Sequence, residues 1–540
     1  MKLTRRELLT MFLGAPLAAA ACGSSPRRNF VPDGEIVGQS VAVGHRIREF
    51  SSHLPQPEKY EEKSIVIVGA GVAGLSAARY LKRQNIHDFI IVELEREPGG
   101  TARSGSSKLA GYPWGAHYLP VPFKENADLI DLLEEMNLTE GRDDSGEIIV
   151  REEFLCREPE ERVFYKGRWY EGLYLHAGAG EEDKRQLSEF QRIIDQWVNW
   201  RDNRGRRAFV VPSAFCSTDE QVRSLDQISF DEWLRQHNLT SSRLLWYCDY
   251  ACRDDYGLRL ENTSAWAGLF YFCSRVRQSG MESQPFITFP EGNGRFVKHM
   301  AAYAGDNMAT GETAVSINPT ESGVEVLCLS GDNLRAYRCR EVIYSAPVFT
   351  APFVIRGFRE QRPFAAEEFQ HNAWFVANLF LSDRPRQRFA KDFPLAWDNV
   401  LYESPSLGYV NATHQKGIDY GPAIFTYYYP MGGDGNQRWQ LFNYSREELA
   451  EVCLSDLERA HPDIRNICER IDIMRWGHAM ISPRPGFIYG GEREKAMKPF
   501  RGIRFAHTDL SGLALFEEAF FHGIRAAREC CENPGAVKRK

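Results

Sequence analysis

The clearest pattern of hydrophobic positions in the chain begins at residue 64. The continuous apolar run over residues 65–68 is typical of a β-strand buried on both faces. A glycine-rich turn follows, and apolar residues then recur at helical spacing over residues 75–84. A second apolar run over residues 89–92 predicts another strand. This order predicts a parallel β-α-β unit and therefore an α/β fold with a Rossmann-like domain.

Farther along the chain, helical and strand patterns alternate irregularly, and the sequence shows no internal repeat. Helical spacing covers residues 188–200 and 229–237, while residues 323–329 and 424–429 are typical of strands. Ser445 and the glutamate three residues later form a capping box that predicts a helix start. We therefore expect the Rossmann-like domain to be accompanied by an α+β substrate domain.

The N-terminus has the features of an export signal. A charged start with Arg5 and Arg6 precedes a short apolar stretch rich in alanine that ends at Cys22. Residues 4–9 resemble the twin-arginine signal of bacteria, which moves folded proteins, and a Sec signal that carries two arginines is the alternative. We therefore expect an exported protein of the bacterial periplasm.

Two cleavage modes are open for this signal. Residues 19–22 resemble a lipoprotein cleavage site, at which Cys22 would be lipidated and hold the protein at the membrane. Cleavage at a nearby Ala-x-Ala site is the alternative. Residues 23–62 show neither helical nor strand periodicity and are expected to be a tether.

Composition narrows the class of protein only slightly. The 540 residues are 43% hydrophobic with a formal charge of −7, so large cores are expected and no basic stripe invites nucleic acid. The twelve cysteines are scattered without a Cys-x-x-Cys pair, so neither a zinc site nor a redox dithiol is indicated, and no metal is expected.

The glycine-rich turn carries the first chemistry. Between a strand and a helix, such a turn lets backbone amides and the positive helix end approach a pyrophosphate. Gly69 permits the turn, Gly71 lets the phosphates come close, with Ala73 beside them, and Gly74 lets the helix pack on the strand. Glu93, at the end of the second strand, is placed to accept hydrogen bonds from a ribose. A glycine turn without a ligand is the alternative.

The residues after Glu93 favour FAD over NAD. Gly99, Gly100, Arg103 and Ser104 resemble the segment that runs along the FAD diphosphate in flavin-containing amine oxidases, phytoene-type desaturases and their relatives. Two glycines let a backbone lie against phosphate, and an arginine can form charge-assisted bonds to it. The resemblance implies a FAD-dependent oxidoreductase that acts on a small-molecule substrate.

Two later segments also resemble this family. Residues 313–317 with 341–347 are similar to its middle FAD segment, which implies that a backbone group near Val315 meets the adenine. Residues 503–512 are similar to its C-terminal segment, which implies that Asp509 binds the ribityl hydroxyls; a helix cap is the alternative for Asp509. The expected pieces are a signal (1–22), a tether (23–62), FAD-binding parts (63–150, 286–350, 476–530), substrate-domain parts (151–285, 351–475) and a tail (531–540).

Candidate catalytic residues come from segments expected to reach the flavin ring. His117 would orient substrate or move a proton, or be a hydrogen-bonded structural histidine. Glu517 and Glu518 follow the Asp509 segment, with Glu518 at a position where the family usually has glycine. Leu515 replaces an aromatic residue of the amine-clamping cage, and residues 371–378 lack the lysine that amine oxidases tend to carry there. Amine oxidation therefore loses support.

Two further segments have both a functional and a structural interpretation. Residues 249–257 could line a substrate cavity with Arg253 holding an anionic group, or could be a salt-bridged helix end. The tyrosines at 427–429 could face a pocket on alternate residues or pack in a sheet.

The sequence thus predicts an exported FAD-dependent enzyme that takes a hydride from a C–C, C–O or C–N bond. A flavin-dependent isomerase or hydratase, and a non-catalytic flavoprotein used in binding or assembly, are the alternatives. The electron acceptor (oxygen, a quinone or a partner protein) stays open.

Overall fold

The computed structural model describes residues 31–48, 57–331, 333–361, 363–432 and 437–532. The predicted signal, with Arg5, Arg6 and Cys22, lies outside the described residues. In the described part, the cysteines form no disulfide, and no helix is both long and apolar enough to cross a bilayer.

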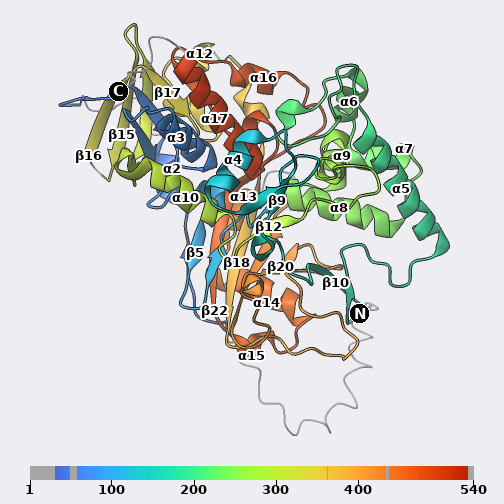
Figure 1. The fold of residues 1–540 in the computed structure, drawn as a ribbon. Coiled ribbons are helices and arrows are strands. Elements are labelled where there is room, and N and C mark those ends of the chain that lie inside the picture. Colours follow the sequence, from blue (N-terminus) through green and yellow to red (C-terminus); the bar gives the residue numbers. More distant parts are fainter. Residues whose placement is uncertain (1–30, 49–56, 332, 362, 433–436, 533–540) are drawn as a thin grey trace, which may run out of the picture.

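A parallel five-stranded sheet forms one side of the molecule (Figure 1). Its central strand is the fully buried apolar run Ile65–Val68, and the glycine turn leads from it into a helix as predicted. The strands come from segments that are far apart in the sequence, so the sheet is complete only when residues 65–68 and residues 503–505 are both in place. In spatial order they are β13 (Met308–Thr310), β4 (Phe89–Glu93), β3 (Ile65–Val68), β17 (Glu341–Tyr344) and β23 (Ile503–Phe505).

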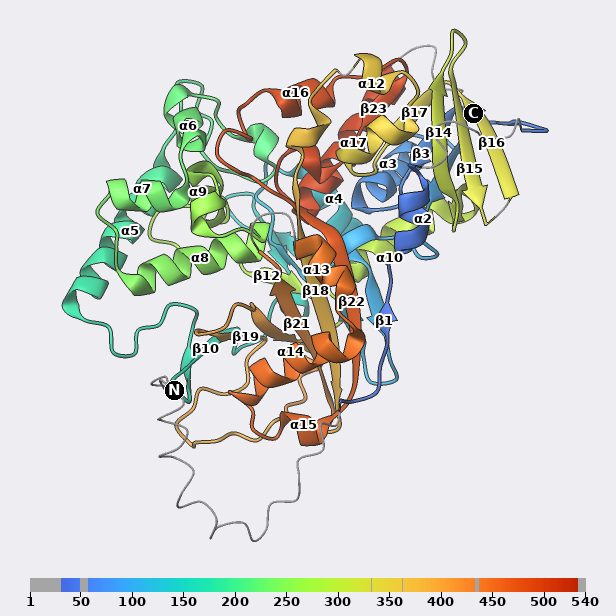
Figure 2. The ribbon, with the colours of Figure 1, turned by 180° about the vertical axis from the view of Figure 1, so that it is seen from behind.

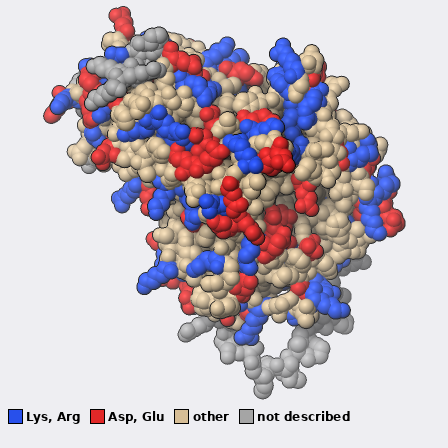
Figure 3. Space-filling view, in the orientation of Figure 1, with Lys and Arg blue, Asp and Glu red and all other residues tan. Residues whose placement is uncertain are grey.

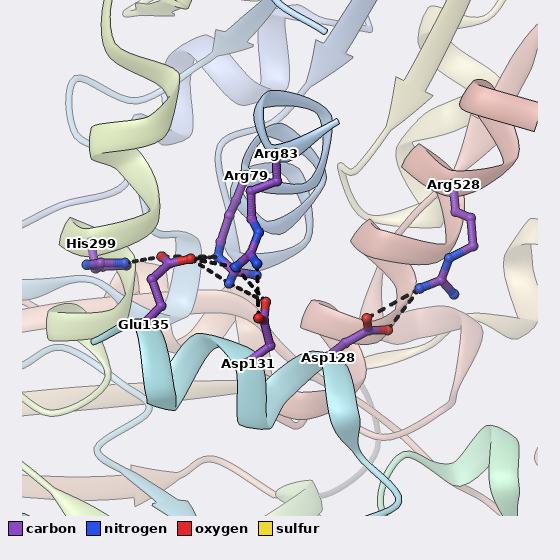
Figure 4. A network of polar contacts seen from close by, with 7 residues as sticks. All are labelled: Arg79, Arg83, Asp128, Asp131, Glu135, His299 and Arg528. Carbon is purple, nitrogen blue, oxygen red and sulfur yellow. Dashed lines mark hydrogen bonds and ion pairs between the residues drawn. The ribbon is translucent and has the colours of Figure 1, made fainter. Parts of the chain in front are cut away.

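Helices cover this sheet, and a smaller sheet continues from it. Ion pairs tie several of these helices together: Glu135 of α4 contacts Arg79, Arg83 and His299 on two neighbouring helices (Figure 4). The helices are α3 (Val72–Arg83), α4 (Ala127–Glu135), α10 (Gly294–Ala304), α11 (Ala351–Val354), α12 (Phe358–Gln361), α16 (Glu492–Met497) and α17 (Phe516–Glu532). The smaller sheet runs β14 (Thr313–Pro319), β15 (Val324–Ser330), β16 (Asn333–Cys339) and β2 (Glu61–Glu62).

Helix α17 lies unusually close to α3. A Cβ atom added at Gly523 would stand 2.0 Å from the carbonyl oxygen of Ala73 and 2.1 Å from Oγ of Ser76. The hydroxyl of Ser76 donates to the carbonyl of Phe520 at 3.1 Å, which fixes the crossing point. This contact joins the glycine turn to the C-terminal segment.

An eight-stranded sheet and a group of helices form the rest (Figure 2). The helices lie on the side away from the small sheet. The large sheet runs β1 (Ile36–Val37), β22 (Cys468–Ile481), β18 (His371–Leu381), β21 (Ala423–Pro430), β20 (Gly408–Asn411), β19 (Asp398–Leu401), β10 (Glu161–Tyr165) and β11 (Arg168–Glu171). The helices are α5 (Glu181–Asn199), α6 (Glu220–Ser224), α7 (Phe230–Gln236), α8 (Ser242–Tyr256) and α9 (Ala265–Cys273).

Short elements complete the described chain, and charges of both signs are interspersed over the face in Figure 3. The remaining strands are β5 (Ser104–Ser106), β6 (Gly111–Pro113), β7 (Tyr118–Pro120), β8 (Thr139–Arg142), β9 (Ile148–Val150) and β12 (Phe286–Thr288). The remaining helices are α2 (Val41–Arg46), α13 (Gln437–Asn443), α14 (Arg446–Glu458) and α15 (Ile464–Ile467).

Several predicted elements are confirmed. Ser445 caps α14 through the reciprocal capping box with Glu448, and β15 and β21 occupy the predicted strands. The predicted helix at 188–200 begins earlier, at Glu181.

The prediction that residues 23–62 lack secondary structure is wrong in the described part. Ile36 and Val37 pair in parallel with Ile473 and Met474 at the edge of the large sheet, and the short helix α2 follows. Segments this short show no periodicity, and the partner strand lies more than four hundred residues away in the sequence.

We expect Gly523→Ala to lower the free energy of unfolding by about 1–3 kcal/mol, because the added methyl group forces α17 away from α3. The control is Gly44→Ala in α2, where an added Cβ meets no atom within 4 Å. Thermal unfolding of both variants checks this expectation. Equal melting temperatures for the two would contradict the close contact.

Candidate functional site

A large cavity lies at the carboxyl ends of β3, β4 and β17, the place where open α/β sheets bind ligands. Its volume is about 410 Å³. The glycine turn, the Gly99–Arg103 segment, the start of β14 and the Asp509 segment all contribute to its wall. The N-terminal residues 39–41 and α2 close one side of it. We call it the cofactor cavity.

The three glycines of the turn differ in what surrounds them. Gly69 has φ +99°, which an L side chain rarely adopts. A Cβ at Gly74 would stand 2.0 Å from the carbonyl oxygen of Gly69, so this glycine allows the helix to pack on the turn. A Cβ at Gly71 would meet no protein atom within 4 Å, although Gly71 lines the cavity. Gly71 thus leaves space on the ligand side, and Gly74 serves packing and does not line the cavity.

Glu93 lines the cavity at the end of β4. Its carboxylate accepts hydrogen bonds from the backbone N–H of Ala70 at 2.5 Å and of Glu95 at 2.9 Å. Burial raises the pKa of Glu93, and the two backbone donors oppose that shift. These bonds orient the carboxylate on the glycine turn, where the sequence predicts contact with a ribose.

Arg103 supplies a buried cation to the same wall. The side chain is 8% exposed, and its Nε atom has no hydrogen-bond partner among the described residues. The guanidinium lies 5.4 Å from the ring centroid of Trp476. A buried donor without a partner is costly, and a diphosphate would satisfy it. Gly99 and Gly100, which have positive φ, line the cavity beside Arg103, so these residues fit a dinucleotide.

Asp509 is fully buried and lines the cavity. Its Oδ1 atom lies 2.8 Å from Nε2 of His371 and 2.9 Å from Nδ1 of His507, while Oδ2 accepts the N–H of Val348 at 2.8 Å. The two histidines lower the pKa of Asp509 against the effect of its burial. Asp509 is therefore an anion, and its contact with ribityl hydroxyls stays a prediction.

Val315 does not line the cavity itself. Its neighbours Thr313 and Ala314 do, and a β-bulge between Ala314 and Ser316 leaves Val315 without a partner in the register with β15. Bulges re-aim backbone groups next to ligand sites. Contact between adenine and the backbone near Val315 stays a prediction.

A second cavity of about 140 Å³ adjoins the first. The two share wall residues from three segments, namely Thr101, Ala116, Trp476, Ala479, Ala514, Leu515 and Phe516. We call it the substrate cavity because it opens on the cofactor cavity and is walled by the large sheet and α8. Its polar wall is acidic: among the described residues it has four carboxyl side chains and one guanidinium, which belong to Asp254, Asp255, Asp398, Glu517 and Arg275.

Most of these carboxyl groups lack a cationic partner. Asp255 pairs with Arg275 at 3.0 Å and thereby occupies the only arginine of the wall within the described chain. Asp398 accepts a hydrogen bond from the hydroxyl of Tyr250 at 3.3 Å, and burial raises its pKa to about 7. Burial and the nearby carboxylates also raise the pKa of Asp254 well above its usual range.

His117 lies on the wall of the substrate cavity. Its ring stacks on Tyr428 with centroids 4.8 Å apart, and the Tyr428 hydroxyl donates to the carbonyl of Gly115 at 2.9 Å. Burial lowers the pKa of His117 to about 4, so the ring is neutral at neutral pH. His117 is placed to hydrogen-bond or stack with a substrate, and it is a poor base in this environment.

The two adjacent glutamates of α17 have different surroundings. Glu517 lines the substrate cavity, whereas Glu518 lines neither large cavity. Glu518 is fully buried and accepts hydrogen bonds from the N–H of Ser213 at 2.6 Å and from the hydroxyl of Ser511 at 2.5 Å. The position of Glu518 therefore supports a structural role, and the prediction that it acts on a substrate has no support in the geometry.

The segment at 249–257 combines both predicted interpretations. Arg253 donates to the carbonyl oxygens of Pro405 and Ser406 and to Asp249, and it does not line either large cavity. Its neighbours Tyr250, Asp254 and Asp255 do line the substrate cavity. The segment thus supplies carboxyl groups, and an anion clamp by Arg253 has no support. Of the three tyrosines at 427–429, Tyr428 alone faces the substrate cavity.

Residues of the site that were not predicted from the sequence include Arg275, Asp398 and Trp476. Asp398 interrupts the apolar stretch around Trp397 and Val400, and a lone acid in a buried strand is a signal that could have been used. Trp476 carries no such signal in its local sequence.

We expect Gly71→Ala to fold normally but to lose most of its FAD, because the methyl group enters the ligand side of the turn. Gly74→Ala should instead lower the melting temperature, because its methyl group meets backbone. Flavin absorbance per protein and thermal unfolding, measured on both variants, check this pair. Full flavin content in Gly71→Ala would show that this space is not used.

Known proteins resemble the chain over most of its length. The putrescine oxidase structure bound to putrescine has a TM-score of 0.64 at 17% identity and covers 87% of this chain and 99% of that one. Oxidoreductase PigB of Serratia sp. is 20% identical over 531 residues, covering 89% of this chain and 76% of PigB. L-amino acid dehydrogenase of Synechocystis sp. is 24% identical over 271 residues. The match covers 49% of this chain and 53% of that relative, so this chain spans only about half of the relative's length.

The family described as flavin containing amine oxidoreductase matches residues 72–531, which include Gly74, Glu93, Arg103 and Asp509. The predictions of the α/β fold, of FAD and of an oxidoreductase are thereby confirmed. The chain belongs to the family of flavin-containing amine oxidoreductases and is a FAD-dependent oxidoreductase.

Proposed function

We propose that this enzyme oxidises the C–N bond of a small cationic amine and that it acts after export from the cytoplasm. The charge of the substrate cavity carries the first part of the proposal. Four carboxyl groups and one guanidinium line it, and Asp255 already pairs with that guanidinium. Burial raises the pKa of Asp254 and Asp398; an ammonium group would favour their ionised forms and pair with them, whereas an anionic substrate would oppose their ionisation.

Aromatic side chains support the same substrate class. Tyr428, Trp374 and Trp476 line the cavity, and aromatic faces attract cations. Leu515 replaces one aromatic residue of the amine-binding cage. Trp374 of β18, Tyr428 of β21 and Trp476 of β22 can supply aromatic rings in its place. The putrescine oxidase of similar fold holds an amine, putrescine, in its solved structure, which is consistent with this substrate class.

The residues of the two cavities have separate tasks. Glu93 and Arg103 would hold the ribose and diphosphate of FAD, with Gly71 beside the phosphates. These residues would hold FAD, which would supply the acceptor for a hydride from carbon. Asp254 and Asp398 would bind the substrate ammonium, while the walls around His117 keep water away from the reacting carbon.

The test is anaerobic bleaching of the flavin against matched amines, alcohols and carboxylic acids. We expect fast bleaching by a cationic amine and none by its carboxylic acid analogue. Preferential bleaching by alcohols would overturn the proposal. Substrate turnover without net bleaching would instead indicate an isomerase.

Asp398→Asn removes one buried negative charge with little change of shape. We expect KM for the amine to rise about 10- to 100-fold, because the ammonium loses a desolvated charge partner, while the flavin content stays unchanged. The control is Asp128→Asn, which removes a surface carboxylate that pairs with Arg528. An equal rise of KM in both variants, or in neither, would contradict the assignment of Asp398.

For export, we infer that Arg5 and Arg6 direct the folded protein to the twin-arginine pathway, which fits a cofactor loaded in the cytoplasm. We expect the doubly substituted Arg5→Lys, Arg6→Lys protein to accumulate in the cytoplasm with its flavin, while the unsubstituted protein reaches the periplasm. Cell fractionation with flavin fluorescence measures this. Unchanged export of the double variant would indicate the Sec pathway.

A further inference from the structure

Glu517 lies between the substrate cavity and a third, smaller cavity. It lines both, together with Pro120 and Arg275. The carboxyl group comes from the first turn of α17, directly after the segment that walls the cofactor cavity. Glu517 is thus the acidic residue common to the substrate cavity and the space behind it.

The carboxyl group of Glu517 has no partner on another residue in the described part of the chain. Its side chain is buried, at 6% exposure, and its one hydrogen bond is with its own backbone N–H. The charged and titratable groups that face it are Arg275, Asp255, Glu518 and Tyr118. Arg275 is already paired with Asp255 at 3.0 Å, and Glu518 is occupied by Ser213 and Ser511. Glu517 is therefore free to accept a proton.

The third cavity measures about 20 Å³, which is enough for about one water molecule. Its wall is polar on the side of Ser274 and Gln284. The hydroxyl of Ser274 is buried and has no hydrogen-bond partner among the described residues, so a water there would satisfy it. Gln284 is half-buried between exposed Ser283 and Pro285. The cavity thus extends from Glu517 toward the protein surface.

We propose that Glu517 accepts the proton that a substrate releases during oxidation and passes it through water in the third cavity to solvent. In the oxidation of H–C–X–H to C=X, the C–H bond gives up a hydride, which carries both electrons to the flavin. The X–H bond breaks and its electron pair forms the C=X bond. The proton from X goes to the Glu517 carboxylate, and the products are C=X, the reduced cofactor and one proton.

This role does not depend on the identity of X. An amine and an alcohol both release such a proton, so the inference rests on the oxidoreductase activity of the family and not on the proposed amine. Burial raises the pKa of Glu517 to about 7, near the operating pH that suits a general base. His117, with a pKa of about 4, is a weaker base, and no lysine lines the substrate cavity in the described residues.

The first experiment compares Glu517→Gln with the unsubstituted holoenzyme. The probe is whichever amine or alcohol bleaches the flavin fastest, and the anaerobic reduction rate is measured from pH 5 to 9. Glu517 must be deprotonated to accept a proton, so the normal rate should fall as the pH drops below about 7. Glu517→Gln should be about 10²- to 10⁴-fold slower and lack this pH limb. An unchanged pH limb in Glu517→Gln would overturn the proposal.

Glu518→Gln is the matched control, because it makes the same change on the next residue of the same helix. Its carboxyl group faces Ser213 and Ser511, so the pH limb near 7 should remain even if the protein becomes less stable. Loss of the limb in both variants would indicate a general disturbance of α17 and would count against Glu517.

Two further measurements do not need turnover of Glu517→Gln. Ser274→Val fills the third cavity. Proton release, measured with a pH-indicator dye, should then lag at least tenfold behind flavin bleaching. Dye response and flavin bleaching at the same time in this variant would overturn the exit path. Infrared difference spectra of substrate-free holoenzyme should show protonated carboxyl bands that titrate near pH 7, because burial raises the pKa of both Asp398 and Glu517 to about 7. Glu517→Gln should lose one of these bands and Asp398→Asn the other. An unchanged spectrum in Glu517→Gln would overturn the assignment.

Discussion

The contact between Gly523 of α17 and the backbone of Ala73 in α3 is the constraint on which both cavities depend. The two helices come from opposite ends of the described chain, and no side chain fits between them at this point. Helix α3 carries the glycine turn at its start, while α17 follows the Asp509 segment and begins with Phe516 and Glu517. Their close approach therefore fixes the distance between the nucleotide-binding turn and the residues that separate cofactor from substrate.

The two large cavities favour ligands of opposite charge. The cofactor cavity contains a buried guanidinium, Arg103, whose Nε atom lacks a partner in the described structure, and it suits an anionic diphosphate. The substrate cavity has an excess of carboxyl groups and suits a cation. For the proposed amine, this separation would favour the diphosphate in one cavity and the substrate in the other, because charges interact strongly in a buried environment. The only arginine of the substrate wall in the described chain pairs with Asp255.

The sequence predicted the position of the glycine turn and Glu93 in the fold because the determinants of this part of the cofactor cavity are local. Gly69, Gly71, Gly74 and Glu93 lie on one strand-turn-helix-strand unit, so spacing along the chain translates directly into spacing in the fold. The substrate cavity could not be predicted in this way. Asp398 and Tyr250 meet only because β19 of the large sheet packs against α8. The sequence of neither segment indicates this contact.

Among the neighbouring residues 253–255 too, tertiary packing decides which side chains reach the substrate cavity. The sequence left open whether Arg253 holds an anionic group or belongs to a salt-bridged helix end; in the structure it donates to the carbonyl oxygens of Pro405 and Ser406, while Asp254 and Asp255 reach the cavity. On a helix each residue is rotated by about 100° from the last, so the choice depends on which face packs inward. Glu517 and Glu518 differ for the same reason. In both helices, tertiary packing determines which side chain faces the cavity, and the local sequence pattern does not predict it.

The N-terminal segment that continues from β1 into α2 has a kinetic consequence for the cofactor. Residues 39–48 form part of the cavity wall. They follow the two-residue pairing of β1 with β22 and are held by the bonds from Ser40 to Glu95 and by the ring contacts of His45 with Trp439 and of Arg48 with Phe353. Local unfolding of such a terminal segment costs less free energy than unfolding of the whole protein, and here it would open one side of the cofactor cavity. We therefore expect the stability of this segment to affect how fast FAD leaves the cavity.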